Sequence, residues 1–403
     1  MLLDWISLFL RWFHVIAGVA WIGASFYFIW LDNNLRTPPD WKKQKGIKGD
    51  LWAVHGGGFY EIAKYEYGPE AMPEKLHWFK WEAYTTWISG FLLLSLVYYH
   101  GASIYLIDNA VMELTPTEAI IRGLGLIFGG LFVYEAACRS PLSKYPQIFG
   151  IAFLIMLMAA SYLATHWFSG RGAFMHVGAL VGTIMAGNVF FKIMPAQRLM
   201  VDAVANKKQV DPSWGLGAKL RSVHNNYLTL PLLFIMISNH YPMTYQHPNA
   251  WLVLMAIGVV SAWIRHYFNL KHIGISRPSI LITGAIGMVL IAGWVSRPIT
   301  PDPDLVSTQP PVPAIALNEQ QQQVFDVMQT HCANCHSAKP TDEIFVVAPL
   351  GLMFDTWQQI QQRAAVIHRR AVITKDMPMM NKTAMTDADR QVIADWFDVT
   401  SKQ

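Results

Sequence analysis

The chain has 403 residues, of which 53% are hydrophobic and only 14% are charged. Because soluble domains carry about 25% charged residues, this composition excludes an ordinary soluble enzyme, a disordered chain and a disulfide scaffold. The formal net charge of +4 comes from basic residues that are scattered between apolar runs, and we therefore expect no nucleic-acid partner.

The first predicted elements are eight apolar stretches that are long enough, or nearly so, to cross a bilayer as helices of about 20 residues. In chain order they cover residues 5–30, 78–99, 117–138, 146–168, 172–194, 226–241, 250–270 and 279–295. The sixth stretch is short and contains Pro231. We predict an all-α fold in which residues 1–296 form a polytopic membrane bundle of about eight spans.

The loops between these stretches indicate the orientation, because cytoplasmic loops carry an excess of Lys and Arg. The first, third, fifth and seventh loops carry seven, two, five and two basic residues, whereas the second, fourth and sixth carry none, one and none. The odd-numbered loops are therefore predicted to be cytoplasmic. Eight crossings then leave both termini in the periplasm, so we expect a multi-pass protein of the bacterial inner membrane, surrounded by the lipid bilayer.

Ionisable side chains inside the predicted spans are costly in a bilayer and mark functional sites. His14 and His176 fall in the half nearer the periplasm, and Glu82 and His224 in the half nearer the cytoplasm. His55, followed by three glycines that permit a tight chain reversal, lies in the first cytoplasmic loop. Any one of these residues is most simply a hydrogen-bonded helix contact. Together they indicate a buried polar site or a second cofactor.

The composition changes after the eighth stretch. Residues 297–317 are rich in Pro and polar residues, which predicts an extended, semi-rigid linker. Residues 318–403 carry two amphipathic helix patterns, over 318–330 and 387–399, and Thr386 can cap the second. A tail of this size can form a small core but needs a cofactor to stabilise it.

The motif C-A-N-C-H at residues 332–336 matches the C-x-x-C-H attachment sequence of c-type haem. Cys332 and Cys335 are spaced to bond both vinyl groups of one porphyrin, and His336 then lies below the iron as its proximal ligand. A zinc half-site would need a second ligand pair, and a redox dithiol would need a βαβ context. The tail sequence has neither, so we predict covalent haem c in a small helical domain of the class I cytochrome c type over 318–403.

The sixth iron ligand is expected from three neighbouring methionines, Met377, Met379 and Met380. A Met–His pair raises the potential of haem iron and suits electron transfer. We favour Met377, because the rigid Pro378 fixes its loop. Haem c is attached outside the cytoplasm, so the motif and the loop charges independently predict a periplasmic tail.

Distance determines whether a second haem is needed. If chemistry takes place near the cytoplasmic face, electrons must cross most of a core about 30 Å thick to reach haem c. Electron tunnelling falls steeply with distance, so an intermediate centre would be needed. A haem b held by neutral histidines is the natural candidate, with His14 and His176 as its first expected ligands. Without such a haem, the substrate site should lie near the periplasmic face.

Three stretches carry a resemblance to a known family: R-W-F-H-V-I-A-G-V-A-W-I-G at 11–23, V-H-G-G-G-F-Y at 54–60 and L-H-W-F-K-W-E-A-Y at 76–84. With the fused C-x-x-C-H tail, they resemble the bacterial membrane-bound urate oxidases that carry a C-terminal cytochrome c domain. The resemblance implies oxidation of urate to 5-hydroxyisourate without hydrogen peroxide. It also implies that electrons leave through the cytochrome domain to a downstream cytochrome c or terminal oxidase.

A urate site needs groups that match a planar anion: a cation, amides for its edges, an aromatic face and a proton acceptor. Glu82 and His55 are candidates for the general base, and His224 is a third candidate catalytic residue. The remaining candidates are Lys64, Arg265, Asn225, Asn226 and Tyr60. Two other functions stay open: a respiratory subunit that oxidises quinol or relays electrons from a partner, and a non-enzymatic carrier with a fused cytochrome.

Overall fold

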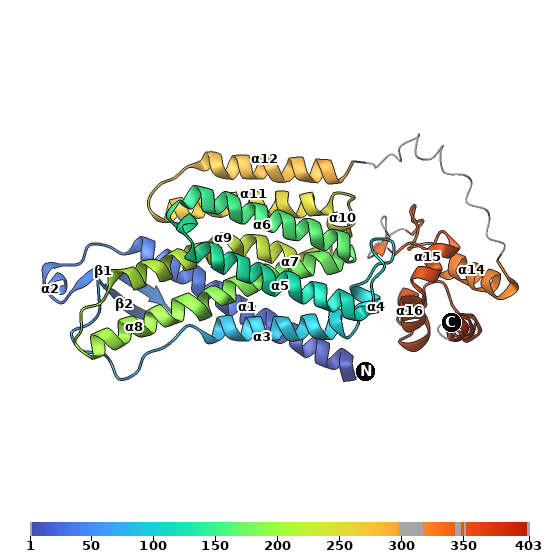
Figure 1. Cartoon of the computed structure of the whole chain (residues 1–403), viewed down its shortest axis with the longest axis horizontal. Helices are drawn as coiled ribbons and strands as arrows, with labels where there is room; N and C mark the ends of the chain where they lie inside the picture. Colours follow the sequence, from blue (N-terminus) through green and yellow to red (C-terminus); the bar gives the residue numbers. More distant parts are fainter. Residues whose placement is uncertain (1, 298–316, 343–347, 350–351, 401–403) are drawn as a thin grey trace.

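The computed structural model describes residues 2–297, 317–342, 348–349 and 352–400. Figure 1 shows a long bundle of helices that run alongside one another, with a group of shorter helices beyond one end. We call residues 2–297 the bundle and the described residues of 317–400 the C-terminal unit. Most of the predicted linker, 297–317, lies outside the described residues.

The bundle consists mainly of long helices. They are α1 (Leu2–Asn34), α3 (Trp81–Leu94), α5 (Pro116–Arg139), α6 (Pro146–Trp167), α7 (Gly170–Asn188), α8 (Met194–Ala205), α9 (Pro212–Ser238), α11 (Ala250–His272) and α12 (Pro278–Val295). π-helical turns at Ser95–Tyr99 and Val189–Ile193 extend α3 and join α7 to α8. The short elements are α2 (Asp40–Lys43), α4 (Ala102–Tyr105), a 3-10 turn (Pro141–Lys144) and α10 (Pro242–Tyr245).

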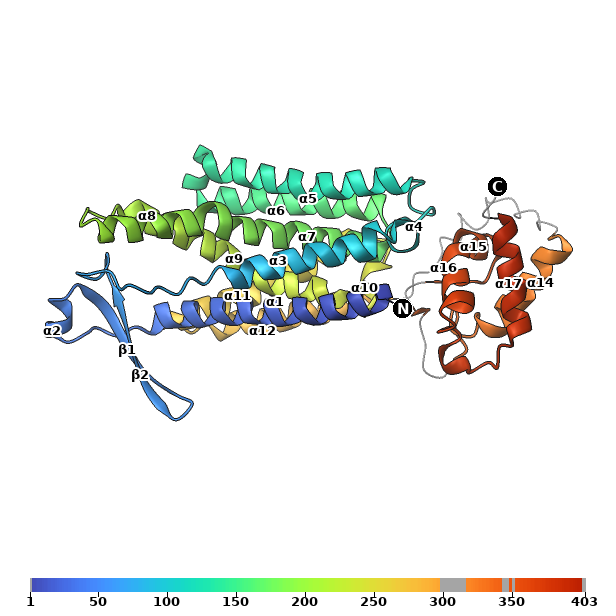
Figure 2. The ribbon, with the colours of Figure 1, turned by 90° about the horizontal axis from the view of Figure 1, so that it is seen from below.

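The helices of the bundle account for all the apolar stretches of the sequence, and the predicted all-α character is confirmed. Among the described residues, six segments are long and apolar enough to cross a membrane: α1, α5, α6, α7 with α8, α11 and α12. The other two predicted spans correspond to α3 and α9. Helix α3 has only 14 residues before its π turn, and the first half of α9 is polar. Both run beside the other helices (Figures 1 and 2), and the count of eight stays a prediction.

Helix α7 lies at the centre of the bundle. In the apolar window of the segment Gly170–Ala205, 67% of residues are buried, against 11% for α1 and for α12. Glycines allow its close packing: a Cβ on Gly130 would lie 2.5 Å from Leu180, and a Cβ on Gly178 would lie 2.6 Å from Ile235. These small residues bring α5 and α9 directly onto α7, so side chains on α7 hold fixed positions relative to both neighbours.

A β-hairpin interrupts the otherwise helical chain, and the sequence did not predict its strands. Strands β1 (Ile47–His55) and β2 (Gly58–Tyr65) pair antiparallel. Gly56 and Gly57 have φ of +58° and +80°, which suits the two-residue turn that favours glycine at both positions. The glycine run is therefore the tip of a hairpin, which projects from one end of the bundle in Figure 2.

The C-terminal unit is helical, with an apolar core of its own. Its elements are α14 (Glu319–His331), α15 (Trp357–Gln362), α16 (Ala364–Ile367), a π turn (His368–Ile373), a 3-10 turn (Met379–Asn381) and α17 (Asp387–Thr400). Helices α14 and α17 confirm the two helices predicted for the tail. Val324, Met328, Ile360 and Ile393 are fully buried between them. Thr386 caps α17 as predicted, accepting a hydrogen bond from the amide of Asp389 at 3.2 Å.

Candidate functional site

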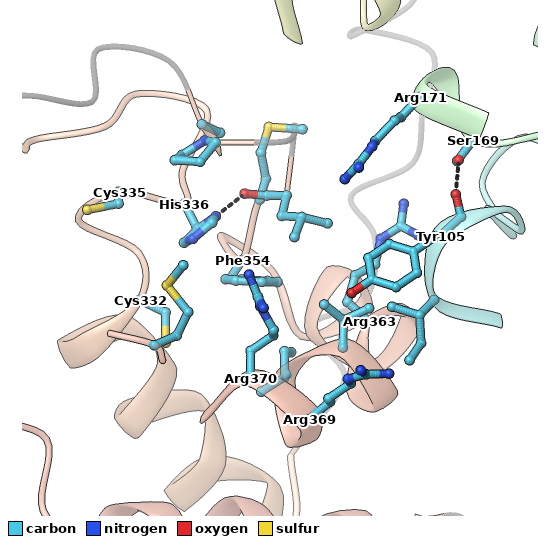
Figure 3. Close-up of a pocket in the computed structure, with 18 of the residues that line it drawn as sticks. Tyr105, Ser169, Arg171, Cys332, Cys335, His336, Phe354, Arg363, Arg369 and Arg370 are labelled. Atoms are coloured by element: carbon cyan, nitrogen blue, oxygen red, sulfur yellow. Dashed lines mark hydrogen bonds between the residues drawn. The ribbon is translucent and has the colours of Figure 1, made fainter. Parts of the chain in front are cut away.

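A cavity of about 1480 Å³ lies between the bundle and the C-terminal unit. Cys332, Cys335 and His336 line it on one side, and Tyr105 and Arg171 line it on the other. Figure 3 shows the two sides facing each other across an open space. Ordinary ligand pockets occupy about 300–1,000 Å³, so this cavity is larger than a site for one small molecule requires.

The position of the haem motif follows from helix α14. The side chain of Asn318 accepts a hydrogen bond from the amide of Gln321 at 2.8 Å and starts the helix, which ends at Cys332. The chain then turns back, with the amide of His336 donating to the carbonyl of Cys332 at 2.9 Å. This turn leaves Cys335 and His336 on the same cavity as Cys332.

The ring of His336 is oriented as a metal ligand requires. Its Nδ1–H donates to the carbonyl of Leu352 at 2.9 Å, which fixes the ring and leaves Nε2 with a free electron pair. Phe354 packs against the ring, with 5.1 Å between centroids. Burial lowers the pKa of His336, so the imidazole is neutral, the form that binds iron.

The two thiols fit haem attachment better than they fit a redox dithiol or a zinc site. Burial raises the pKa of Cys332 to about 12 and also raises the pKa of Cys335, whereas a redox dithiol depends on a thiol of lowered pKa. Within the described residues, no group of three or more His, Cys, Asp and Glu side chains could hold a metal ion, so a zinc site has no second ligand pair there. The donors present fit haem c, which stays a prediction.

All three candidate methionines line the cavity, but they differ in how firmly they are held. Met379 and Met380 are 41% and 86% exposed. Met377 is half-buried, and its carbonyl accepts a hydrogen bond from the Arg390 guanidinium at 2.8 Å. The geometry therefore favours the predicted ligand, Met377, over its two neighbours.

The bundle side of the cavity is built around the first turn of α7. Ser169 caps this helix by accepting from the amide of Gly172 at 3.1 Å, and its hydroxyl donates to the carbonyl of Tyr105 at 2.8 Å. Arg171 lies in the same turn, and its Nε donates to the side-chain oxygen of Asn239 at 3.0 Å. The Arg171 guanidinium lies 5.8 Å from the centre of the Tyr105 ring. Both side chains are thereby held in place at the cavity.

Tyr245, the last residue of α10, also lines the cavity. It is only 4% exposed, and its hydroxyl has no hydrogen-bond partner within the described part of the chain. Burial raises the pKa of Tyr245 to about 12, so the hydroxyl stays neutral and can donate. Its position is tightly fixed, because a Cβ on Gly170 would lie 2.3 Å from the carbonyl oxygen of Tyr245.

Two ion pairs join the C-terminal unit to the bundle. Arg363 Nη2 lies 2.6 Å from Asp108 Oδ2, and both side chains are largely buried, at 20% and 17% exposed. Arg369 Nη2 lies 4.0 Å from Asp4 Oδ1 in a more exposed pair. The first pair is the stronger link, because burial reduces the screening of its charges.

The two predicted haem b ligands, His14 and His176, contact different parts of the bundle. His14 Nδ1 is 3.0 Å from both the Thr86 carbonyl and the Ser89 hydroxyl. His176 Nδ1–H donates to the Gly172 carbonyl at 2.8 Å, and within the described residues its Nε2 has no partner.

The space beside each of these imidazoles is closed by helix backbone. A Cβ on Gly123 would lie 2.6 Å from His176 Nε2, and a Cβ on Gly90 would lie 2.9 Å from His14 Cε1. A haem plane next to either ring would require α5 or α3 to move away. This arrangement does not favour haem b at His14 and His176, and we route no electron transfer through it.

The three candidate catalytic residues are not brought together as a group. His55 is exposed at the tip of the hairpin that projects from the bundle (Figure 2). Glu82 lies in the first turn of α3, and its Oε2 is buried without a hydrogen-bond partner in the part of the chain that the structure covers. His224 Nδ1 is hydrogen-bonded to the Tyr134 hydroxyl at 2.8 Å inside a paired network. The placement of His55 does not favour it as a general base.

The network around His224 is structural in character. Arg221 forms a bidentate pair with Glu135, at 2.9 and 3.1 Å, and also donates to Asn188 at 2.7 Å. Asn188 in turn donates to Asn225 at 2.8 Å. These groups satisfy one another, as buried polar groups must, so the network ties α5, α7 and α9 together rather than facing a ligand.

A second polar group surrounds Arg265 near the opposite end of the bundle. Arg265 is 5% exposed, hydrogen-bonds Asn226 through Nε, and lies 4.0 Å from the centre of the Phe26 ring. Its Nη2 and the side-chain oxygen of Asn269 are buried and have no partner among the described residues. This is the alternative for an anion site, at the end of the bundle that the sequence predicts to be cytoplasmic. The other two candidates from the first loop, Tyr60 and Lys64, lie on strand β2 of the hairpin.

Three residues on the bundle side of the cavity were not predicted from the sequence: Tyr105, Arg171 and Tyr245. A signal for one of them was present. Arg171 is the single basic residue in the three loops predicted to be periplasmic, on the side where topology disfavours basic residues. Nothing in the local sequence distinguishes Tyr105 or Tyr245 from the other tyrosines, because only the fold brings α4 and α10 to the start of α7.

The fold and the cavity define the class of this molecule: a helical protein able to cross a membrane, with a second helical unit docked at one end. Residues 1–296 match the family described as urate oxidase N-terminal. The chain therefore belongs to the urate oxidase N-terminal family, which confirms the resemblance for this part and supports an oxidoreductase that acts on urate. No curated protein and no solved structure matches the chain.

Proposed function

We propose that this protein oxidises urate to 5-hydroxyisourate and transfers the electrons through a covalently bound haem c to a downstream cytochrome c or terminal oxidase. Urate and one water give 5-hydroxyisourate, two protons and two electrons, so no hydrogen peroxide is formed. One observation carries the proposal: a chain of the urate oxidase family has its C-x-x-C-H motif on the cavity shared by the bundle and the C-terminal unit.

In this proposal, Cys332 and Cys335 bind the porphyrin, and His336 and Met377 bind its iron. When bound, haem c supplies a one-electron acceptor of raised potential. The chain contributes the rest. Leu352 holds the proximal imidazole in one tautomer through its carbonyl, 2.9 Å from Nδ1, and Phe354 excludes water from one side of that ring.

We further propose that the C-terminal unit lies in the periplasm and the bundle in the bacterial inner membrane. Two independent arguments support this orientation. Haem c is attached outside the cytoplasm, and the basic residues concentrate in the alternate loops. A reporter fused after residue 403 that proved active only in the cytoplasm would contradict it.

The proposed function is tested by mixing the purified, oxidised, haem-loaded protein with urate under anaerobic conditions. We expect the haem c absorbance to change to that of the reduced form, with two haems reduced per urate consumed. A pyridine haemochrome spectrum of the same sample reports the c and b haems separately. Reduction by quinol but not by urate would overturn the proposal in favour of a respiratory electron-transfer subunit.

The general base is tested separately by Glu82→Gln, His224→Gln and His55→Gln in the same assay. Loss of a general base costs about 10²–10⁴-fold in rate, while binding of urate to the reduced protein should change little. We expect no loss for His55→Gln, given its exposed position on the hairpin. Unaltered turnover eliminates the residue concerned.

A further inference from the structure

The cavity between the bundle and the C-terminal unit carries an excess of positive charge. Its charged lining residues are Arg11, Arg171, Arg363, Arg369, Arg370, Lys382, Asp4, Asp108 and Asp342. Six cations against three anions leave a surplus of three positive charges within the described lining. One of these three is balanced by Asp376, which pairs with Arg370 from outside the lining, so Arg11 and Arg171 are the two lining cations without a carboxylate partner in the described part of the chain.

Arg171 is the better candidate of the two for a substrate anion, because Arg11 is exposed and its Nε bonds only the hydroxyl of Ser7. Arg363, Arg369 and Arg370 each have a carboxylate partner, at 2.6, 4.0 and 2.6 Å. Arg171 has no carboxylate partner in the described part of the chain, and its Nε bonds only the neutral Asn239. It also lies in the first turn of α7, where the helix dipole adds to the attraction for an anion.

The neighbours of Arg171 suit a planar molecule with polar edges. The guanidinium lies 5.9 and 5.8 Å from the centres of the Tyr98 and Tyr105 rings, and of these two rings Tyr105 lines the cavity. The buried hydroxyl of Tyr245 has no partner among the described residues, although a group so well buried is normally hydrogen-bonded. Aromatic faces, a fixed cation and an unsatisfied donor are what a purine anion needs.

Electron transfer favours this end of the molecule over the Arg265 group. Arg265 lies fifteen residues along α11 from Ala250, which corresponds to roughly 22 Å at 1.5 Å per residue. Ala250 itself lines the cavity. A urate bound near Arg265 would therefore be separated from haem c by most of the bundle, and the close helix backbone beside His14 and His176 does not favour a haem b between them. A urate bound at Arg171 shares the cavity with His336.

We propose that Arg171, Tyr105 and Tyr245 form a binding site for a planar purine anion, urate, in the cavity that also holds the haem attachment residues. This inference rests on the proposed function and adds the location of the substrate. Urate would give its two electrons, one at a time, to ferric haem c in the same cavity, while water supplies the new oxygen and two protons leave. A downstream one-electron acceptor reoxidises the haem between the two transfers.

The test measures urate binding apart from turnover. The haem-loaded protein is first reduced with dithionite, so that it cannot oxidise urate, and the dissociation constant is measured by equilibrium dialysis with radiolabelled urate. We expect Arg171→Gln to weaken binding at least 10-fold and Arg171→Lys to restore part of it. Tyr105→Phe and Tyr245→Phe, which keep the packing, should each weaken binding about 3-fold or more. Haem content, from the pyridine haemochrome spectrum, should stay at the wild-type level.

Two control variants make the result specific. Arg122→Gln removes another arginine of the bundle, which lies 5.3 Å from the Trp167 ring and does not line the cavity, and should leave urate binding unchanged. Arg265→Gln removes the cation of the alternative site. Weakened binding in Arg265→Gln with normal binding in Arg171→Gln would overturn the inference and assign urate to the cytoplasmic side.

The reduction potential of haem c distinguishes two roles for Arg171: binding urate and pairing with a haem propionate. If Arg171→Gln shifts the reduction potential of haem c while urate binding stays normal, Arg171 serves a haem propionate and the inference is wrong. If wild-type protein neither binds nor oxidises urate, the proposed function fails together with the inference. Wild-type urate oxidation with unaffected binding in Arg171→Gln and both tyrosine variants rejects the inference alone.

Discussion

At the scale of single residues, the buried pair between Arg221 and Glu135 gives a sharp stability prediction. Arg221 and Glu135 side chains are 7% and 14% exposed. Removing one partner of a buried pair costs about 3–5 kcal/mol, and Arg221→Ala would leave the buried Glu135 carboxylate with only the exposed Arg139, 3.4 Å away. We expect Arg221→Ala to lower the thermal midpoint of the detergent-solubilised protein clearly.

Arg139 provides the matched control, since it contacts the same carboxylate at 3.4 Å but is 73% exposed. Exposed pairs contribute about 0–1 kcal/mol, so Arg139→Ala should leave the midpoint nearly unchanged. Equal losses in the two variants would show that burial does not determine the effect and would contradict the argument.

The axial methionine gives a second prediction at this scale. Axial ligands set haem potentials over about 0.8 V, so Met377→Leu should lower the haem c potential on the order of 0.1 V or more and alter its oxidised spectrum. Met380→Leu should leave both unchanged, since Met380 is 86% exposed. Redox titration of the two variants measures this difference, and a larger shift for Met380→Leu would make Met380 the ligand.

The sequence alone was enough to predict the haem attachment side of the cavity but not the side formed by the bundle. Cys332, Cys335 and His336 form a contiguous motif whose spacing carries its chemistry, so the sequence was sufficient to propose their role. Arg171 and Tyr245 lie 74 residues apart and meet only because α10 packs beside the start of α7. His55 and Glu82 looked equivalent in sequence, yet His55 is exposed on a hairpin, whereas Glu82 is half-buried with its Oε2 atom fully covered.

At the scale of elements, the approach of α7 to α10 depends on Gly170. A Cβ there would lie 2.3 Å from the carbonyl oxygen of Tyr245. Gly170→Ala must therefore push α10 away, and overpacking of this kind costs about 1–3 kcal/mol. We expect a lower thermal midpoint together with weaker urate binding.

Gly125→Ala is the control for this prediction, because nothing lies within 4 Å of a Cβ at that position. Alanine is the better helix former by about 1 kcal/mol, so this variant should be as stable as wild type or slightly more stable. A Gly170→Ala protein as stable as wild type would mean that α10 can move without cost and that its contact with Gly170 does not fix the position of Tyr245.

The cap of α17 predicts a pH dependence. Asp389 accepts hydrogen bonds from the Thr386 hydroxyl and amide, at 2.7 and 2.8 Å, and these hold its pKa below the ordinary value of 3.8. Because the folded-state pKa is the lower one, the stabilisation is complete above the unfolded-state value of about 3.9. It is lost as the pH falls through the folded-state pKa.

We therefore expect the thermal midpoint of the C-terminal unit, followed by haem absorbance, to fall as the pH drops below about 4, where the carboxylate is protonated. Asp389→Asn should weaken the cap at neutral pH by up to about 1 kcal/mol and make the acid decline shallower. Asp395→Asn, on the same helix but outside the cap, should follow the wild-type curve. An unchanged acid decline in Asp389→Asn would assign the pH dependence to other groups.

Helices were predicted correctly where the hydrophobic residues form one long run or recur with the helical period. Long apolar runs and the 3.6-residue patterns of 318–330 and 387–399 gave helices that the structure confirms. The strands at 47–65 were missed because they project from the bundle and lack a continuous buried face, so alternation was weak. Gly56 and Gly57 carried the turn signal, and a tight chain reversal was expected there, but without strands on either side of it.

At the scale of the whole molecule, the ion pair between Asp108 and Arg363 determines how closely the C-terminal unit approaches the bundle. Its 2.6 Å contact is largely buried beside the cavity. If urate binds on the bundle side, the haem must stay close to it, because electron tunnelling falls steeply with distance. Asp108→Arg places two like charges together, which costs several kcal/mol in a desolvated contact, and should slow urate-dependent haem reduction at least 10-fold.

The charge swap is the decisive measurement. Asp108→Arg combined with Arg363→Asp restores opposite charges at the same two positions, and stopped-flow absorbance should show most of the wild-type rate recovered. Wild-type haem reduction should also slow at high salt, because the exposed pair of Arg369 and Asp4 is screened. If Asp108→Arg reduces haem at the wild-type rate, this ion pair does not control electron transfer. If the rate stays low in the swapped protein, the loss comes from damage to one unit rather than from the contact between them.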